Sequence, residues 1–371
     1  MAYEISKELA RRGHDVTVCT TNVLSGERMF DPKKKVYNIN GVKVHYHRNL
    51  LYKPHAFIPL FYSQGVVHEI RKNIVDYDVI HIHENRFYTS ILLHHYAKKH
   101  RIPYVLQAHG DLPRMTKQSM KILFDSFWGH KLLKDASKAI ALNNTEAEQY
   151  RSMGVLEEKI AVIPNGIDLS EYADLPPKGS FKKKFNIPEN KRIILYLGRI
   201  HKTKGIDLLV KAYAYLVKSM KYGDAFLVIA GPDDEYLAEI KSLSANLNVS
   251  DSVLFTGFIS GSDKLKALVD ADVFVTPSFH GFPVTFLEAG ITSTPIITTS
   301  LGDTLDWIEG RVGYVTRPTS HELARAMHAI ISNDDLRQQF SRNSRRITQS
   351  EFSSARVIDR LEQVYREVAG K

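Results

Sequence analysis

The sequence predicts an α/β protein made of two doubly wound domains, and three features lead to this prediction. Short β-branched runs alternate with amphipathic helical segments along the whole chain, as parallel sheets covered by helices on both faces require. The length of 371 residues exceeds what one hydrophobic core usually serves. A stretch rich in Pro and Gly and without periodicity, residues 174–179, separates two groups of strand runs and marks the end of a linker.

The strand runs follow one another in chain order at similar spacing. In the first half, an Asn40-Gly41 pair between two alternating runs indicates a hairpin with a type I′ turn over residues 36–46. An amphipathic helix is expected over residues 353–369. The expected strands are 15–21, 78–83, 104–110, 139–143 and 160–164 in the first half, and 192–198, 225–231, 253–257, 272–277, 295–300 and 313–316 in the second.

The opening of the chain differs from what a doubly wound domain requires. Residues 1–12 predict an amphipathic helix with Ile5 and Leu9 on one face and Gly13 at its end. Such a domain normally opens with a central strand whose following loop contacts phosphate. We therefore expect the first strand to be missing through truncation or a misassigned start. A genuine deletion is disfavoured because it would leave a gap in the middle of the sheet.

The composition indicates a globular protein with a basic surface. The chain has 43% hydrophobic and 25% charged residues and a formal net charge of +9. This charge suits nucleic acid, an anionic membrane or a phosphorylated small molecule, and a solvated basic surface explains it equally well. We find neither a transmembrane run nor a signal peptide, and the single Cys19, expected as a small core residue, fits a reducing cytosol. The expected location is therefore cytoplasmic.

The most informative segment begins where the strand 272–276 runs into the loop 277–283, after which a helix begins. A helix that starts from such a loop presents free backbone N–H groups and the positive end of its dipole, so it holds phosphate well. Glu288 lies one turn into this helix, where its carboxylate can accept hydrogen bonds from the hydroxyl groups of a sugar.

Two further strand ends carry polar residues. After the strand 192–198, Arg199 offers a bidentate fork and Lys204 a point charge, so this loop can hold a diphosphate. His109 closes the strand 104–110 and is expected to point into the crevice of an open α/β sheet. His81 and His83 share one strand face, but no further ligand stands at a diagnostic spacing, so we expect no metal there.

These motifs, each at a strand end and in this order, resemble the retaining nucleotide-sugar glycosyltransferases of the GT-B fold, family 4 (glycosyl transferases group 1). The resemblance covers nearly the whole chain from its first helix onward. It implies two Rossmann-like domains that face each other across a cleft, with the C-terminal helix crossing back to the first domain. The implied domains are an acceptor-binding domain (1–168), a nucleotide-sugar domain (169–350) and the crossover helix (351–371).

The resemblance also implies roles for individual residues. His109 contacts the transferred sugar, Arg199 and Lys204 contact the donor diphosphate, and Glu288 contacts the ribose; these four form the expected catalytic set. The family carries a second glutamate where this chain has His280. The complete donor set is Gly198, Arg199, Lys204, Gly231, Ile259, Lys264, His280, Gly281, Phe282, Pro283, Val284, Thr285 and Glu288, and the acceptor set is His83, Glu84 and Asp111.

The expected activity is retaining transfer of a sugar from a UDP- or GDP-sugar to a hydroxyl of a glycan, a lipid-linked molecule or a small molecule. No metal and no other cofactor is expected, because cationic side chains and helix ends take that role. Two alternatives remain: a non-catalytic nucleotide-sugar-binding homologue, and an epimerase or hydrolase on the same fold. The amphipathic, Lys-rich stretch 117–134 either packs on the sheet or makes peripheral contact with an anionic membrane. No nucleic-acid motif is present.

Overall fold

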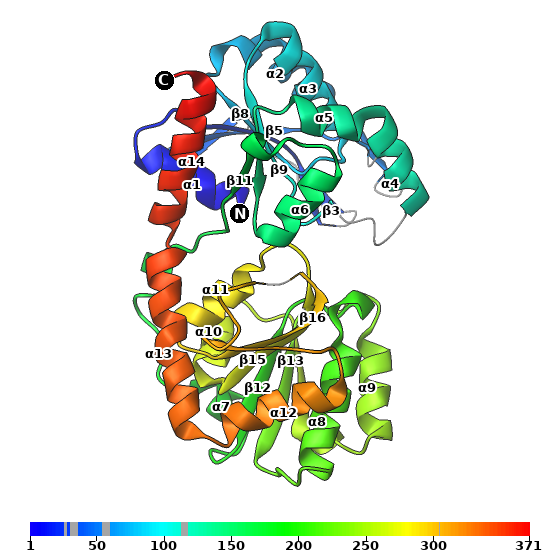
Figure 1. Ribbon diagram of the computed structural model, residues 1–371, viewed down its shortest axis with the longest axis vertical. Coiled ribbons are helices and arrows are strands. Elements are labelled where there is room, and N and C mark those ends of the chain that lie inside the picture. Colours follow the sequence, from blue (N-terminus) through cyan, green and yellow to red (C-terminus); the bar gives the residue numbers. More distant parts are fainter. Residues whose placement is uncertain (26–27, 30–35, 54–59, 113–117, 304) are drawn as a thin grey trace. The chain divides into compact units, whose positions relative to one another are not determined.

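The computed structural model describes residues 1–25, 28–29, 36–53, 60–112, 118–303 and 305–371. The chain divides into two compact units: one contains Met1–Asn165 and Ser354–Lys371, and the other contains Gly166–Ser353. The sequence placed the first boundary after residue 168 and the start of the C-terminal crossover segment at residue 351. Each unit combines parallel strands with covering helices, so the predicted α/β class is confirmed (Figure 1).

The second unit, Gly166–Ser353, contains one parallel sheet of six strands in the order β14-β13-β12-β15-β16-β17. The chain runs outward from β12 through β13 and β14, then returns to the other side of β12 at β15. The point where the order reverses, between β12 and β15, is where open α/β sheets bind ligands. The strands are β12 (Arg192–Leu197), β13 (Ala225–Ala230), β14 (Val253–Gly257), β15 (Val273–Phe279), β16 (Ile296–Gly302) and β17 (Gly313–Thr316).

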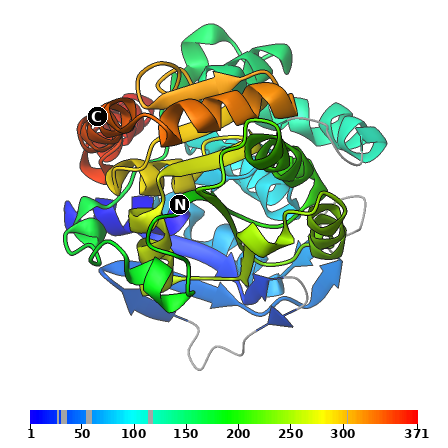
Figure 2. The ribbon, with the colours of Figure 1, turned by 90° about the horizontal axis from the view of Figure 1, so that it is seen from below.

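Helices cover this sheet because each turns an apolar face toward it. α8 and α12 lie side by side, drawn in green and orange in Figure 2, and their buried Leu209, Tyr213, Leu323 and Met327 join one core with the strands. The helical segments of the unit are η4 (Leu169–Tyr172), α7 (Ser180–Lys184), η5 (Lys202–Lys204), α8 (Ile206–Lys218), α9 (Leu237–Asn246), η6 (Ser250–Ser252), α10 (Gly261–Asp270), α11 (Val284–Ile291), α12 (Ser320–Ile331) and α13 (Asp334–Glu351).

The first unit holds its main strands in two sheets, β1-β5-β4 and β11-β10-β9-β8. Among the described residues, β1 pairs with β5 alone and β8 with β9 alone, so both are edge strands. The antiparallel pair β4–β5 confirms the hairpin predicted at Asn40-Gly41. Cys19 is exposed on β1, so the prediction of a core cysteine was wrong. The strands are β1 (Thr17–Thr21), β2 (Val23–Ser25), β3 (Arg28–Met29), β4 (Val36–Ile39), β5 (Val42–His47), β6 (Leu51–Lys53), β7 (Leu60–Tyr62), β8 (Ile80–His83), β9 (Tyr104–Gln107), β10 (Lys138–Ala141) and β11 (Ile160–Val162).

The C-terminal helix α14 packs against the first helix, α1, within this unit (Figure 1). Ile5 and Leu9 of α1 share a core with Leu361, and Arg12 bonds to Asp359 at 2.6 Å and to Glu362 at 3.1 Å. The helical segments are α1 (Ala2–Arg11), α2 (Gln64–Asn73), η1 (Ile74–Asp76), α3 (Tyr88–His100), α4 (Gln118–Phe124), η2 (Asp125–Gly129), α5 (His130–Asp135), α6 (Asn144–Ser152), η3 (Glu157–Lys159) and α14 (Ser354–Ala369).

The amphipathic stretch of the sequence analysis forms α4, η2 and α5, apart from residue 117, which lies outside the described residues. Phe124 and Leu132 are buried, as core packing requires. Ile122, Leu123 and Phe127 are exposed instead, Phe127 to 59%. One face of the stretch therefore packs in the core, and another face exposes apolar side chains to solvent.

Candidate functional site

The predicted donor-binding residues of the second unit lie at the carboxyl ends of neighbouring parallel strands. Gly198 directly follows β12, Gly231 follows β13, Ile259 comes two residues after β14, and His280 directly follows β15. Because β12 and β15 flank the reversal of strand order, the loops that follow them border the crevice of the sheet.

The ends of β12 and β13 come together at two glycines. The N–H of Gly198 donates to the carbonyl of Ala230 at 2.9 Å. A Cβ atom at position 231 would lie 1.8 Å from the carbonyl oxygen of Gly198, so a side chain has no room there. The absence of a side chain at Gly231 therefore allows the close approach of these two strand ends.

Arg199 lies in the loop after β12 and is largely exposed, with 63% of its side chain accessible. Its Nη1 forms an ion pair of 2.7 Å with Oδ2 of Asp234, a contact that the sequence did not predict. Exposed ion pairs contribute little to stability, about 0–1 kcal/mol. A phosphate can therefore replace Asp234 as the partner of this guanidinium at small cost.

Lys204 ends the short helix η5 in the same loop and is half-buried. Within the part of the chain that the structure describes, no carboxylate lies within ion-pair distance of its ammonium group. Burial, and then the positive charge of Arg199, lower the pKa of Lys204. Two cations near each other, one of them poorly solvated, form a site that an anion would stabilise.

His280 follows β15, and its neighbour is a carboxylate from the next strand end. Nδ1 of His280 lies 3.6 Å from Oδ1 of the buried Asp303. Oδ2 of Asp303 accepts the N–H of Gly281 at 2.6 Å, so this N–H, expected to serve a phosphate, bonds to a carboxylate here. Neither ring nitrogen of His280 has a hydrogen-bond partner among the described residues. Asp303 is a site residue that the sequence reasoning missed.

The rest of the predicted loop divides into packing and helix-end residues. The ring of Phe282 packs with the rings of Trp307 and Phe352, at centroid distances of 6.4 and 5.4 Å, so its side chain belongs to an aromatic cluster. Pro283 precedes α11, and no side chain caps the start of this helix. The first turn, with Val284 and Thr285, therefore offers its N–H groups to an anion.

Glu288 is buried on α11 and bonds to two side chains through a single oxygen. Its Oε1 accepts from Nζ of Lys264 at 2.6 Å and from the hydroxyl of Tyr172 at 3.0 Å. No donor to Oε2 is present in the described ranges, so this oxygen can accept from a ligand. Lys264, expected beside the base, contacts Glu288, and Tyr172 was not predicted from the sequence.

In the first unit, adjacent strands β8 and β9 bring three histidines together. Nδ1 of His83 and Nε2 of His109 lie 2.8 Å apart, within hydrogen-bond distance. The ring of His83 stacks on those of His81 and His109, with centroid distances of 4.1 and 5.1 Å. Burial lowers the pKa of His81 to about 3 and that of His109 to about 4, so these rings are neutral at pH 7.

Helix α6 holds the turn that carries His109. The expected strand 104–110 ends at Gln107, because the next residues turn and His109 takes a φ of 53°. Buried Glu146 accepts the N–H of Gly110 at 2.7 Å and that of Leu142 at 2.6 Å. The sequence analysis missed Glu146, although the spacing Asn143-x-x-Glu146 is a capping signal that marks it.

The predicted acceptor residues Glu84 and Asp111 lie beside these strand ends. Glu84 directly follows β8 with a φ of 69°, and its N–H donates to the carbonyl of Gln107 at 2.8 Å. Asp111 is held by Lys121 at 3.0 Å and by Arg86 at 3.4 Å. Burial, and then the charge of Asp111, raise the pKa of Glu84 to about 7.

This raised pKa predicts a pH dependence of stability. Folded Glu84 keeps its proton between pH 4.5 and about 7, where the unfolded chain has lost it, so its contribution to stability falls as the pH rises through this window. The loss is on the order of 3 kcal/mol. We expect Glu84→Gln to remove this loss.

Chemical denaturation of both proteins from pH 4 to pH 8 measures the effect. The free energies of unfolding should agree near pH 4 and diverge in favour of Glu84→Gln toward pH 8. The three histidines affect the pH dependence of stability equally in both proteins. The difference between the two curves of unfolding free energy against pH therefore reports the contribution of Glu84. Parallel curves would show that Glu84 titrates normally.

Both halves of the chain match known protein families. Residues 177–347 match the family described as glycosyl transferases group 1, and residues 1–171 match glycosyltransferase family 4. The chain is 27% identical to an uncharacterized glycosyltransferase of Methanocaldococcus jannaschii, over 98% of this chain and 92% of the relative. It is 26% identical to the UDP-Gal:alpha-D-GlcNAc-diphosphoundecaprenol alpha-1,3-galactosyltransferase of Escherichia coli, over 78% of this chain and 75% of that protein.

Solved structures share the architecture. The chain resembles HepE of Anabaena, determined in complex with UDP and glucose, with a TM-score of 0.77 at 17% identity, over 99% of this chain and 95% of HepE. It resembles WaaG, a glycosyltransferase involved in lipopolysaccharide biosynthesis, with a TM-score of 0.70 at 18% identity, over 100% and 95% of the two chains. The fold is therefore that of the GT-B glycosyltransferases. The two family matches span both units, and the chain belongs to the group 1 glycosyl transferases.

Proposed function

We propose that this glycosyltransferase moves a sugar from a nucleoside diphosphate sugar to an acceptor hydroxyl, with retention of anomeric configuration and without a metal ion. The observation that carries the proposal is the pair of cations, Arg199 and Lys204, at the strand end that borders the reversal of strand order. HepE was determined with UDP, and the Escherichia coli relative is named for UDP-Gal, which favours uridine as the base.

The leaving group of this reaction is a nucleoside diphosphate, whose negative charge grows as the glycosidic bond breaks. Arg199, Lys204 and the N-terminal N–H groups of α11 would stabilise that charge where it develops. One such preorganised contact contributes roughly 2–4 kcal/mol to lowering the barrier. These groups supply the positive charge that a metal ion supplies in other transferases, which is why we propose a metal-independent reaction.

The remaining site residues would orient the donor. Glu288 would accept from the ribose hydroxyls through Oε2, while Lys264 and Tyr172 fix the other oxygen. His109, neutral at pH 7, would bind a hydroxyl of the transferred sugar. A donor phosphate oxygen could then take the acceptor proton, so that retention needs no carboxylate nucleophile.

His280 and Asp303 would set the preference for the donor sugar. We expect His280→Glu to lower donor affinity at least about tenfold, because it adds a second negative charge beside Asp303, whose Oδ1 lies 3.6 Å from Nδ1 of His280, and both charges would repel the donor diphosphate. The double variant with Asp303→Asn should recover affinity, with an altered ranking of donor sugars. Calorimetry across a panel of UDP-sugars measures both effects. Unchanged affinity and ranking in the single variant would make His280 a bystander.

The exposed apolar side chains of α4 and η2 would bring the enzyme to a lipid-linked acceptor. Ile122, Leu123 and Phe127 are exposed, and so are the nearby Lys131 and Lys134, which suits an anionic membrane surface. In the described part of the chain, no helix has the length and apolar character to cross a bilayer.

The variant Phe127→Ser tests this surface. We expect it to weaken cosedimentation with phosphatidylglycerol vesicles severalfold. Val75→Ser removes an exposed apolar residue elsewhere and should leave cosedimentation unchanged. Equal sedimentation of all three proteins would remove this surface from the proposal.

The reaction itself is tested by incubating the protein with UDP-sugars, with and without lipid-linked and glycan acceptors, in the presence of a chelator. Proton NMR of the product should show the anomeric configuration of the donor. Free sugar formed equally without acceptor would indicate a hydrolase, and an altered sugar still attached to the nucleotide would indicate an epimerase. Binding of UDP-sugars without any product would identify a non-catalytic homologue.

A further inference from the structure

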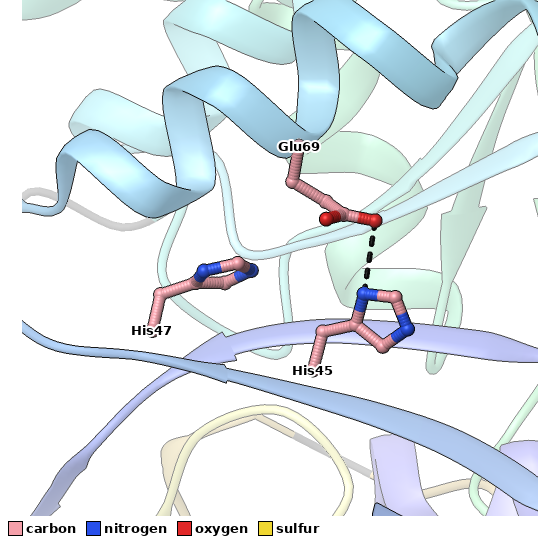
Figure 3. Close-up of side chains that lie close together, drawn as sticks. All are labelled: His45, His47 and Glu69. Atoms are coloured by element: carbon pink, nitrogen blue, oxygen red, sulfur yellow. Dashed lines mark ion pairs between the residues drawn. The ribbon is translucent and has the colours of Figure 1, made fainter. Parts of the chain in front are cut away.

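Three potential metal ligands lie together in the first unit, and none of them is assigned to the transfer reaction. His45 and His47 alternate along β5, so both side chains lie on the same face of the sheet, and Glu69 reaches them from α2 (Figure 3). Nδ1 of His45 lies 2.9 Å from Oε1 of Glu69. One ligand atom from each of the three residues lies within 4.8 Å of the other two.

Neighbouring residues fix the positions of these side chains. Nδ2 of Asn73, one turn further along α2, donates to Oε1 of Glu69 at 2.6 Å and orients the carboxylate. A Cβ at position 65 would lie 2.5 Å from Nδ1 of His47, so the first turn of α2 meets this imidazole only because Gly65 has no side chain. Second-layer contacts of this kind are typical of metal ligands.

We propose that His45, His47 and Glu69 form a binding site for a divalent transition-metal ion, and that Zn²⁺ fits it best. Two imidazole nitrogens and one carboxylate oxygen are a donor set that Zn²⁺ takes in proteins. Bonds of about 2.0–2.2 Å in a tetrahedron place ligand atoms roughly 3.5 Å apart, so the cluster needs only a small contraction.

A water molecule would supply the fourth ligand, because the cluster of described ligand atoms contains only His45, His47 and Glu69 and does not include Cys19. Cys19 is the neighbour of His45 in the parallel pairing of β1 and β5, so the two side chains share a face of the sheet. Desolvation by the surrounding protein, and then the charge of Glu69, raise the pKa of the Cys19 thiol to about 12, which disfavours the thiolate that binds metal ions. The water molecule would complete a tetrahedral site beside the three protein ligands.

Such a site would tie the sheet β1-β5-β4 to helix α2. The ligands come from elements that neighbour each other only in the folded chain, so the ion would bind the native state and stabilise it by mass action. The role is structural, because none of the ligands belongs to the predicted donor or acceptor set.

The test uses the full chain without an affinity tag, stripped of metal by a chelator. Calorimetric titration with Zn²⁺ should show one equivalent bound with micromolar or tighter affinity, and Co²⁺ should give the intense visible bands of tetrahedral coordination. His47→Gln and Glu69→Gln should each weaken binding at least about tenfold. His68→Gln, an exposed histidine on the same helix, should leave the affinity unchanged.

Glu69→Gln keeps the shape of the side chain, so it remains informative if His47→Gln does not fold; circular dichroism of the metal-free variants checks this. A Co²⁺ spectrum without a near-ultraviolet thiolate-to-Co²⁺ band would support water as the fourth ligand, and such a band, if it disappears in Cys19→Ser, would overturn that assignment. Absence of micromolar binding, or binding that survives in both folded ligand variants, would overturn the site itself.

Discussion

Arg199→Ala and Lys204→Ala should each lower kcat/KM at least about tenfold, and up to about 10³-fold where the contact acts fully in the transition state. Both cations would face the leaving diphosphate. Neither cation has a strong partner within the protein. The ion pair of Arg199 with Asp234 is exposed, and the pKa of Lys204 is lowered, which a bound anion would reverse. Steady-state kinetics with the preferred UDP-sugar, beside calorimetry with UDP, measures the effect.

The fold should survive both changes, because Arg199 is exposed and the side chain of Lys204 forms no ion pair with any described carboxylate. Circular dichroism checks this. Lys202→Ala is the matched control, since Lys202 is an exposed cation of the same loop and its side chain forms no hydrogen bond or ion pair with any described residue. If both variants fold and keep their affinity and turnover, the diphosphate does not bind at this strand end.

Glu288→Gln should lower the affinity for UDP by roughly 10- to 100-fold while leaving the affinity for inorganic pyrophosphate almost unchanged. Only the nucleotide has ribose hydroxyls, and a hydrogen bond to a charged acceptor contributes about 1.5–3 kcal/mol. A glutamine can turn its oxygen toward Lys264 and Tyr172, which leaves an amide NH₂ where Oε2 accepted from the ribose. Competition calorimetry with the two ligands gives the comparison.

The variant also removes the negative partner of Lys264, so a second change is needed to separate the two effects. Lys264→Met keeps the carboxylate and removes the ion pair. If Lys264→Met shows the same selective loss of affinity for UDP as Glu288→Gln, the effect of Glu288 operates through Lys264. Equal losses of UDP and pyrophosphate in Glu288→Gln would contradict the ribose role.

The sequence was sufficient for those features that local patterns encode. The alternation of strands and helices gave the fold class, and Asn40-Gly41 gave the hairpin of β4 and β5, since turn chemistry acts over a few residues. Patterns at the strand ends also marked the loops that follow β12 and β15. Each of these features depends on neighbours in the chain.

The partners of the site residues could not be obtained in this way. Gly281 meets Asp303 22 positions away, Gly110 meets Glu146 36 positions away, and Glu288 meets Tyr172 116 positions away. These pairs depend on how helices and strands pack, and a single sequence does not show which distant residues meet. The exposure of Cys19 has the same origin, because the burial of a strand side chain depends on what packs on its face of the sheet.

The contact between His83 and His109 determines what His109 can recognise. A neutral imidazole has one nitrogen that donates and one that accepts, and Nε2 is committed to His83. When Nε2 of His109 donates to His83, Nδ1 of His109 is a hydrogen-bond acceptor. When Nε2 accepts from His83, Nδ1 is a donor. A carboxylate or an ammonium group on a ligand suits only one of the two arrangements. A hydroxyl group both donates and accepts, so it suits either arrangement, and in the role proposed for His109 the ring pair would favour the chemical group that a sugar carries on almost every carbon.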